Sequence, residues 1–93
     1  MRFVWDPEKS RANLRKHHVS FEVAAEVFDD PLHRSIPDRI VDGEQRWQTL
    51  GMVGGVIVLL VAHSYLDDEE EEVVRIISAR KATRKERRDY ENS

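Results

Sequence analysis

Cysteine is absent from the 93-residue sequence, and this absence excludes two kinds of structure. Neither a disulfide framework nor a thiolate-bound metal site can form without it. A fold that needs no disulfides suits the reducing conditions of the cytosol. The sequence also offers no convincing cluster of metal-ligating side chains, so we expect neither a metal nor any other cofactor.

Long hydrophobic runs are also absent. The longest apolar stretch, Val56 to Ala62, is far shorter than the roughly 20 residues that a bilayer-spanning helix needs. The segment Met1 to Asp6 lacks the apolar region of a secretory signal. We therefore expect a cytoplasmic protein that makes no contact with membranes.

The chain has no overall excess of positive charge, since 15 Lys and Arg against 18 Asp and Glu give a net charge of -3. This balance argues against nucleic-acid binding by the whole surface. Positive charge is nevertheless concentrated in residues 73–88, where an apolar strand pattern runs into a basic segment. Such a concentration beside a rigid strand is typical of a phosphate-binding or phosphate-cleaving site. The acidic run Asp67 to Glu72 is expected to form an exposed loop between two strands.

Two helices are predicted near the N-terminus. The first begins at Pro7, with Asp6 as its N-cap, and ends near His17. Its apolar face is thin and consists mainly of Ala12 and Leu14, so the helix must be stabilised by its neighbours.

The second helix is predicted to follow Ser20, which is its candidate N-cap. Its apolar residues recur with helical spacing and share one face; they are Phe21, Ala24, Ala25 and Phe28. The residue before Pro31 is disfavoured in a helix, so Asp29 and Asp30 end it.

Strand patterns occupy most of the remaining sequence. The expected strands are residues 3–5, a weak candidate at 32–36 that ends at Pro37, residues 45–53, residues 56–62 with His63 at the far end, and residues 73–79. A turn at residues 42–44 and a two-residue hairpin at Gly54-Gly55 connect them. The continuous apolar run at 56–62 indicates a central strand that is buried on both faces.

A short basic helix is predicted to close the chain. Thr83 and Glu86 have the spacing of a capping box, and Tyr90 is the large side chain that docks the helix. The expected fold is thus a single α+β domain over residues 1–93. Its helices, two at the N-terminus and the short basic one at the end, are expected on one face of a mostly antiparallel sheet.

Several segments occur in an order and spacing that resemble a known family. They are Phe3-Val4-Trp5-Asp6-Pro7, Asn13-Leu14-Arg15-Lys16-His17, Val19-Ser20-Phe21-Glu22, Val27-Phe28-Asp29-Asp30-Pro31, Glu44-Gln45-Arg46-Trp47 and the basic segment from Arg75 through Ile76-Ile77-Ser78-Ala79-Arg80 to Arg87. Together they resemble the BrnT family of bacterial type II toxins over nearly the whole chain. Two features depart from the family pattern: His18 stands where glycine is usual, and the acidic run 67–72 is longer than the family's hairpin turn.

The resemblance implies a RelE-like ribonuclease that arrests translation by cutting RNA, either free or associated with the ribosome. It also implies a cognate BrnA-like antitoxin that carries a ribbon-helix-helix DNA-binding part. Promoter DNA would be bound only through that antitoxin, and paired toxins would be held by paired antitoxins in a hetero-oligomer.

Metal-independent RNA cleavage by 2'-hydroxyl attack needs a proton acceptor, cations for the developing phosphate charge and a proton donor. His63 is the first candidate for proton transfer, because imidazole titrates near neutral pH and the residue follows a rigid strand. The alternative is a structural histidine that satisfies a buried hydrogen bond. His17 and His18 are interpreted as capping or surface residues at the end of the first helix.

The candidate phosphate ligands are arginines. Arg80 and Arg84 could face one anion at the corner between strand and helix, although a solvated basic face is the bland alternative. Arg46 and Arg75 lie inside strand patterns and need either a phosphate or an ion-pair partner such as Glu44.

Lys81 and Trp47 are further candidates for contact with the substrate. Trp47 could stack on a base, but core packing is the common fate of tryptophan in so small a domain. Two competing functions stay open at this stage. One is a nucleic-acid-binding module without catalysis, and the other is a small interaction protein whose surface exists to meet an antitoxin.

Overall fold

The computed structural model describes residues 1–66 and 70–92. Its elements are β1 (Arg2–Val4), α1 (Pro7–His17), α2 (Phe21–Ala25), the 3-10 helix η1 (Glu26–Asp29), β2 (Arg34–Val41), β3 (Glu44–Val53), β4 (Ile57–Leu66), β5 (Val73–Lys81) and α3 (Arg84–Glu91). None of the helices in the described residues is long and apolar enough to cross a membrane.

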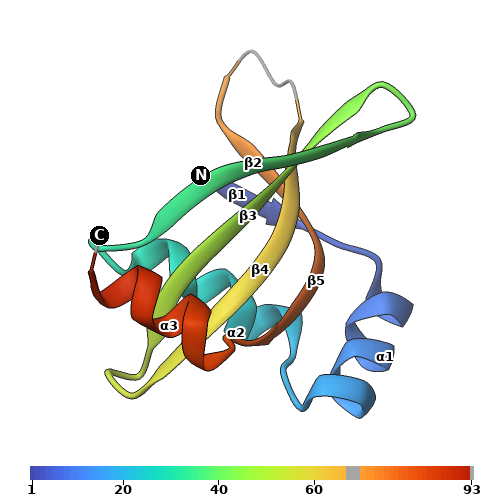
Figure 1. The fold of residues 1–93 in the computed structure, drawn as a ribbon. Coiled ribbons are helices and arrows are strands. Elements are labelled where there is room, and N and C mark those ends of the chain that lie inside the picture. Colours follow the sequence, from blue (N-terminus) through green and yellow to red (C-terminus); the bar gives the residue numbers. More distant parts are fainter. Residues whose placement is uncertain (67–69, 93) are drawn as a thin grey trace.

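The strands form one sheet in the order β1-β5-β4-β3-β2 (Figure 1). β1 pairs with β5 in parallel, whereas the pairs β5–β4, β4–β3 and β3–β2 are antiparallel. The predicted α+β class is confirmed. Part of the acidic run, residues 67–69, lies outside the described residues, and Glu70 to Glu72 are exposed before β5.

β2 is longer than predicted, because it runs through Pro37 instead of ending there. Proline is tolerated at this position because β2 is the outer strand, where a missing N–H need not break a ladder. The register shifts between Pro37 and Ile40, which marks a bulge. Asp42 and Gly43 then turn the chain with positive φ angles of 50° and 79°. The hairpin after β3 has three residues between its strands, because Val56 is added to Gly54 and Gly55.

The helix starts follow the predicted capping chemistry. Asp6, Ser20 and Thr83 each accept a hydrogen bond from a backbone N–H in the first turn, and Thr83 and Glu86 complete the capping box. The predicted buried face of α1 was wrong, since Leu14 is 48% exposed and Ala12 is exposed as well. The buried residues of α1 are polar instead: Ser10 and Asn13.

Asn13 joins α1 to the free edge of β5. The pairing of β1 with β5 ends at Val4 and Arg75, so the edge beyond is not covered by a strand. There the Asn13 Nδ2 donates to the Ala79 carbonyl at 2.8 Å, and the Ala79 N–H donates to the Asn13 Oδ1 at 3.1 Å. The Asn13 Nδ2 also donates to the Val19 carbonyl at 2.8 Å. One side-chain amide thus takes the place of the next peptide group of β1.

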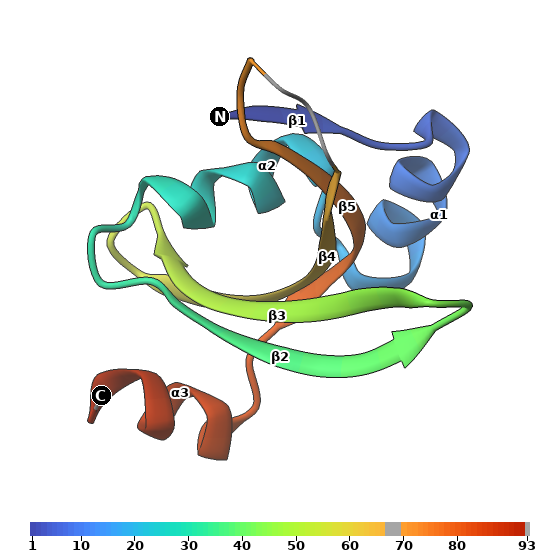
Figure 2. The same ribbon diagram turned by 90° about the horizontal axis from the view of Figure 1, so that it is seen from above.

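The two faces of the sheet are covered by different helices. α2 and η1 lie on one side and α3 on the other (Figure 2). The larger core includes Phe21, Val27 and Val61, and the smaller one joins Tyr90 of α3 to Leu50, Val58 and Leu60. The prediction that the helices share one face was therefore wrong. The two-sided apolar pattern of β4 did require cover on both faces, and α3 supplies the second cover.

Gly51 permits the close approach of η1 to β3. A Cβ atom at this position would lie 2.7 Å from both the Cβ and the carbonyl oxygen of Val27. The backbone oxygen cannot move aside cheaply, so this contact requires glycine. The approach brings Phe28 of η1 onto the ring of His63 in β4, with ring centroids 5.0 Å apart.

Candidate active site

The face of the sheet that carries α3 is only partly covered by that helix. Strand pairing places Gln48, Ala62 and Ser78 in one row across β3, β4 and β5. The adjacent row contains Ser64 opposite Arg75, with Arg46 in β3 two residues before Gln48 on the same face. Ser64 is fully buried, and we call the other five residues the open face. It is polar and cationic, unlike the apolar part of the same sheet face under α3.

Glu44 connects the two arginines of the open face. Its Oε1 lies 3.0 Å from the Arg46 Nε and also accepts a hydrogen bond from the Arg75 Nη2. The ion pair with Glu44 that was the alternative for Arg46 is thus present. Two guanidinium groups share one carboxylate, so the cluster keeps a net positive charge. The buried Ser64 Oγ has no hydrogen-bond partner among the described residues, and the contact of the buried Arg46 Nε with Glu44 is an ion pair without hydrogen-bond geometry.

Arg80 is held by the capping residue of α3. Its two terminal nitrogens donate to the two carboxylate oxygens of Glu86 at 2.8 and 3.0 Å. This bidentate hydrogen bonding lowers the pKa of Glu86 to about 2, and it raises the pKa of Arg80. Arg84 is the exposed first residue of α3. The structure therefore gives Arg80 a carboxylate partner at the corner where a shared anion was expected.

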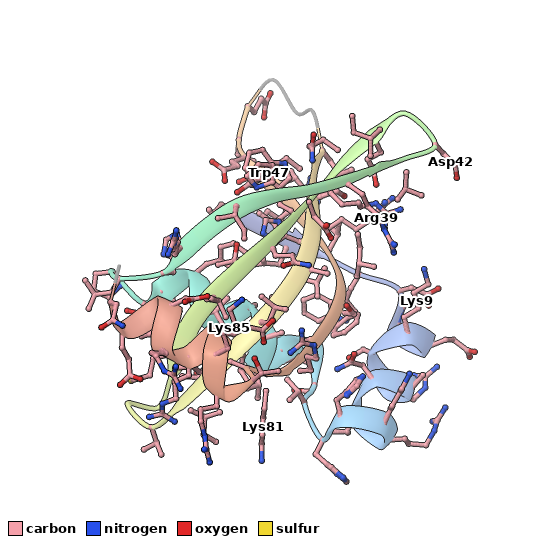
Figure 3. All side chains as sticks on the ribbon, in the orientation of Figure 1. Lys9, Arg39, Asp42, Trp47, Lys81 and Lys85 are labelled. Atoms are coloured by element: carbon pink, nitrogen blue, oxygen red, sulfur yellow. The ribbon has the colours of Figure 1, made fainter. Side chains whose placement is uncertain are left out.

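A groove crosses the open face beside Arg80. It has a volume of about 350 Å³ and is lined by His17, Asp38, Arg39, Gln48, Leu60, Ala62, Ser78, Ala79 and Arg80. A second hollow of about 560 Å³ shares Gln48 and Leu60 with it and extends between β2 and α3, where Arg34 and Lys85 line it. Figure 3 shows Arg39 and Lys85 projecting from β2 and α3. The open face, the groove and the second hollow share residues and form one surface with Arg or Lys side chains from β2, β3, β5 and α3.

His63 lies elsewhere, in the middle of β4 and not at its end. The side chain is fully buried on the side of the sheet that α2 and η1 cover, between the rings of Phe28 and Tyr65. Its Nε2 is 2.7 Å from the Thr49 Oγ1, which is in turn 2.7 Å from the Ser35 Oγ. Burial, followed by the charge of His33, lowers the pKa of His63 to about 4. His63 is thus placed as a structural histidine with a buried hydrogen bond, which was the alternative to a role in proton transfer. An RNA phosphate on the open face cannot reach its ring.

Trp47 and Lys81 also lie away from the open face. Strand alternation directs Trp47 to the side opposite Arg46, where its ring contacts Tyr65 at a centroid distance of 5.6 Å. Lys81 is next to Arg80 and therefore points to the opposite side; it pairs with Leu59. Figure 3 shows its side chain extending away from the body of the protein. Neither residue is placed to contact a substrate bound beside Arg46 and Arg75.

Sequence reasoning missed the role of β2 and of the end of α1 in the groove. Asp38 and Arg39 lie in the bulge of β2, between Pro37 and Ile40, and the weak strand pattern did not predict this bulge. His17 was interpreted as a surface or capping residue. Its spacing of four residues from Asn13 was the available signal, because residues four apart share one face of a helix.

Comparison with known proteins first places the chain in the class of toxins from type II toxin–antitoxin systems. The chain belongs to the BrnT family, described as "Ribonuclease toxin, BrnT, of type II toxin-antitoxin system", whose model matches residues 5–86. The predicted family is thereby confirmed, and membership of a type II system implies an antitoxin partner.

A solved structure supports the same assignment. The fold is similar to that of the Brucella abortus ribonuclease toxin BrnT, known from a crystal structure at 1.1 Å resolution, with a TM-score of 0.71 and 26% sequence identity. The alignment covers 90% of this chain and 99% of the Brucella chain. No curated protein sequence matches the chain.

Proposed function

We propose that this toxin cleaves RNA on the open face without a metal ion, and that it does so by attack of the 2'-hydroxyl on the adjacent phosphate. The observation that carries the proposal is the pair of guanidinium groups, from Arg46 and Arg75, that converge on one carboxylate in the polar part of the sheet face beside α3. Guanidinium groups donate paired N–H hydrogen bonds to the oxygens of phosphates as they do to those of carboxylates. Two arginines that bind the Glu44 carboxylate can therefore also bind a phosphodiester.

The arginines supply binding and transition-state stabilisation. Arg46 and Arg75 hold the non-bridging oxygens, and their charge stabilises the pentacoordinate phosphorus as negative charge builds up. The 2'-oxygen forms a bond to phosphorus while the bond to the 5'-oxygen breaks. The products are a 2',3'-cyclic phosphate and a 5'-hydroxyl, and no water or metal is consumed. Arg80 and Arg84 extend the positive surface along the RNA strand toward α3.

The partner in this proposal is a cognate BrnA-like antitoxin, which neutralises the toxin by covering the open face. A segment with acidic side chains would match the charge of this surface. The antitoxin's ribbon-helix-helix part would carry the complex to promoter DNA as a paired hetero-oligomer. The site of action is the cytoplasm, where a RelE-like toxin would arrest translation by cutting mRNA, free or on the ribosome.

The test compares RNA cleavage by the purified parent protein and by Arg46→Ala and Arg75→Ala, in EDTA and with or without ribosomes. Loss of a transition-state donor costs roughly 100- to 1,000-fold in rate, which is the expected effect of each substitution. Arg11→Ala is the matched control, since Arg11 is an exposed α1 residue paired with Glu8. When the same proteins are expressed in bacteria, the parent and Arg11→Ala should arrest growth, whereas Arg46→Ala and Arg75→Ala should do so much less.

Two results would contradict the proposal. Cleavage that is abolished by EDTA and restored by a divalent cation would exclude a metal-independent reaction. If the parent binds RNA but does not cleave it, with or without ribosomes, the protein is a nucleic-acid-binding module that acts by binding alone.

A further inference from the structure

RNA cleavage on the open face needs a group that exchanges a proton, and the arginines cannot do this because a guanidinium stays protonated. His63 is enclosed in the core on the other side of the sheet. The groove beside the open face contains one imidazole, that of His17, among the residues that line it. We propose that His17 is the catalytic residue that removes the proton from the 2'-hydroxyl, an inference that rests on the proposed function.

The position of His17 follows from the attachment of α1. Asn13 is fixed to the backbone of Ala79 by two hydrogen bonds, at 2.8 and 3.1 Å. His17 is four residues further along α1, so both side chains lie on the same face of the helix. That face looks onto the edge of β5 where Ala79 is followed by Arg80. The last turn of α1 thus carries an imidazole to the wall of the groove.

The cap of α1 does not require the His17 side chain. The helix ends at His17 and is capped by His18, which has the left-handed conformation and whose backbone N–H donates to the Leu14 carbonyl at 2.9 Å. The acidic Asp6 cap and Pro7 act at the opposite end. The capping role that the sequence suggested is therefore filled by backbone groups.

The other groove residues suit a phosphate close to this imidazole. Arg39 of β2 provides positive charge on one wall, whereas the guanidinium of Arg80 in β5 is paired with Glu86. Gln48 and Ser78 provide neutral polar groups in the lining. Asp38 of β2 is the acidic residue of the lining, and its Oδ2 accepts a hydrogen bond from the Gln48 Nε2 at 3.1 Å. If Arg46 and Arg75 hold the phosphate as proposed, a ribose that extends from it into the groove toward Arg39 and Arg80 lies on the α1 side.

The step balances as a proton transfer coupled to phosphoryl transfer. An imidazole nitrogen of His17 takes the 2'-hydroxyl proton, and the resulting oxygen forms its bond to phosphorus. The bond from phosphorus to the 5'-oxygen breaks, and that oxygen takes a proton from solvent. General-base catalysis of this kind contributes roughly 100- to 10,000-fold to a rate.

The experiment measures single-turnover cleavage of a fixed RNA by the parent, His17→Ala and His17→Gln from pH 5 to 9, together with RNA affinity and thermal unfolding. We expect both variants to lose at least roughly 100-fold in cleavage rate while RNA affinity changes less than about threefold. The acid limb of the pH–rate profile should disappear, and added imidazole should restore part of the rate of His17→Ala. His18→Asn is the matched control, because asparagine tolerates the left-handed backbone at the neighbouring exposed position.

The outcomes separate this inference from the proposed function. If Arg46→Ala is inactive but His17→Ala cleaves with the parent's rate and pH profile, His17 is not the base and the open face is still the active site. If His17→Ala loses affinity in proportion to rate and imidazole restores nothing, the residue only binds or supports the groove. A parent protein that cleaves no RNA overturns both proposals.

Discussion

Tyr90 donates a hydrogen bond from its phenolic hydroxyl to the Oδ2 of Asp30, and this contact ties the last turn of α3 to the segment between η1 and β2. The same oxygen accepts the Met52 N–H at 2.8 Å, and Oδ1 accepts the Leu32 N–H at 2.9 Å. The hydrogen bond to Asp30, with burial and the nearby negative charge, raises the pKa of Tyr90 to about 12. Asp30 thus connects three parts of the chain that are distant in sequence.

The first prediction concerns this contact. Tyr90→Phe should lower the free energy of unfolding by about 1 to 3 kcal/mol, because it removes a hydrogen bond to a charged acceptor but keeps the ring in its apolar contacts. Asp30→Asn should cost at least as much, since it weakens three hydrogen bonds. Urea denaturation measures both values. Asp29→Asn, at the exposed neighbouring position, is the control and should stay within about 0.5 kcal/mol of the parent.

The second prediction concerns Asn13. Asn13→Ala should destabilise the fold by roughly 3 kcal/mol or more, because the Ala79 N–H and two carbonyls lose their partner in a buried place. Thermal or urea unfolding gives the value, with Lys16→Ala on the exposed side of α1 as the control. An Asn13→Ala protein as stable as the parent would mean that water replaces the amide at the edge of β5 without loss.

The third prediction concerns His18, where the sequence departs from the family's glycine. The structure keeps the left-handed conformation at this residue, with a φ angle of 61°. His18→Gly should therefore stabilise the protein by about 1 kcal/mol, since glycine adopts this conformation without a Cβ penalty. His18→Ala provides the comparison in the same melting experiment and should give no gain. Equal melting temperatures for the glycine and alanine variants would contradict the argument.

The fourth prediction is a pH dependence of stability that originates at His63. Its pKa is about 4 in the folded protein, below the ordinary value of 6.5, because burial disfavours the charged ring. As the pH falls below 6.5 the unfolded chain binds a proton that the folded protein does not. The contribution of the neutral ring is therefore fully present above pH 6.5 and is lost as the pH falls toward 4.

The size of this effect follows from the shift of the pKa. Across the whole window it amounts to about 3 kcal/mol. Denaturation of the parent and of His63→Gln at pH 7 and pH 5 tests it, before the shifted carboxylate of Glu86 titrates. The parent should lose stability between these pH values and the variant should lose less. If the parent and His63→Gln lose the same stability between pH 7 and pH 5, the pH dependence originates at groups other than His63.

The N-termini of the helices were predictable from the sequence, because N-capping depends on residues that are close together in the chain. Asp6, Ser20 and Thr83 act within their own first turns, so no knowledge of the fold was needed to find them. The buried face of α1 was not predictable in this way. Ser10 and Asn13 are buried because they bond to the backbone of Phe21 and Ala79, and the second of these lies 66 residues away in the chain.

The candidate site was predictable in its residue types but not in its geometry. Glu44 was considered from the sequence as an ion-pair partner of Arg46, and Glu86 as a capping residue; both contacts are present. The ion pair between Arg80 and Glu86 was not predicted. The face occupied by His63 was not predictable, because a shift of one residue moves every side chain of a strand to the other side of the sheet. The bulge in β5 opposite Ala62 and His63 adds to this uncertainty in register.

The position of β5 between β1 and β4 affects when the groove can form during synthesis. β1 is synthesised first but pairs with β5, so Arg2 lies opposite Val73, a residue that is far away in the sequence. Folds with such long-range contacts form slowly and late. Ribosomes add about 5 to 20 residues per second, so the N-terminal strand waits for seconds before its partner exists. Arg75, Ser78 and Arg80 all belong to β5. A nascent chain that lacks this strand has no groove, so the surface on which we propose RNA cleavage cannot form before residue 81 has been synthesised.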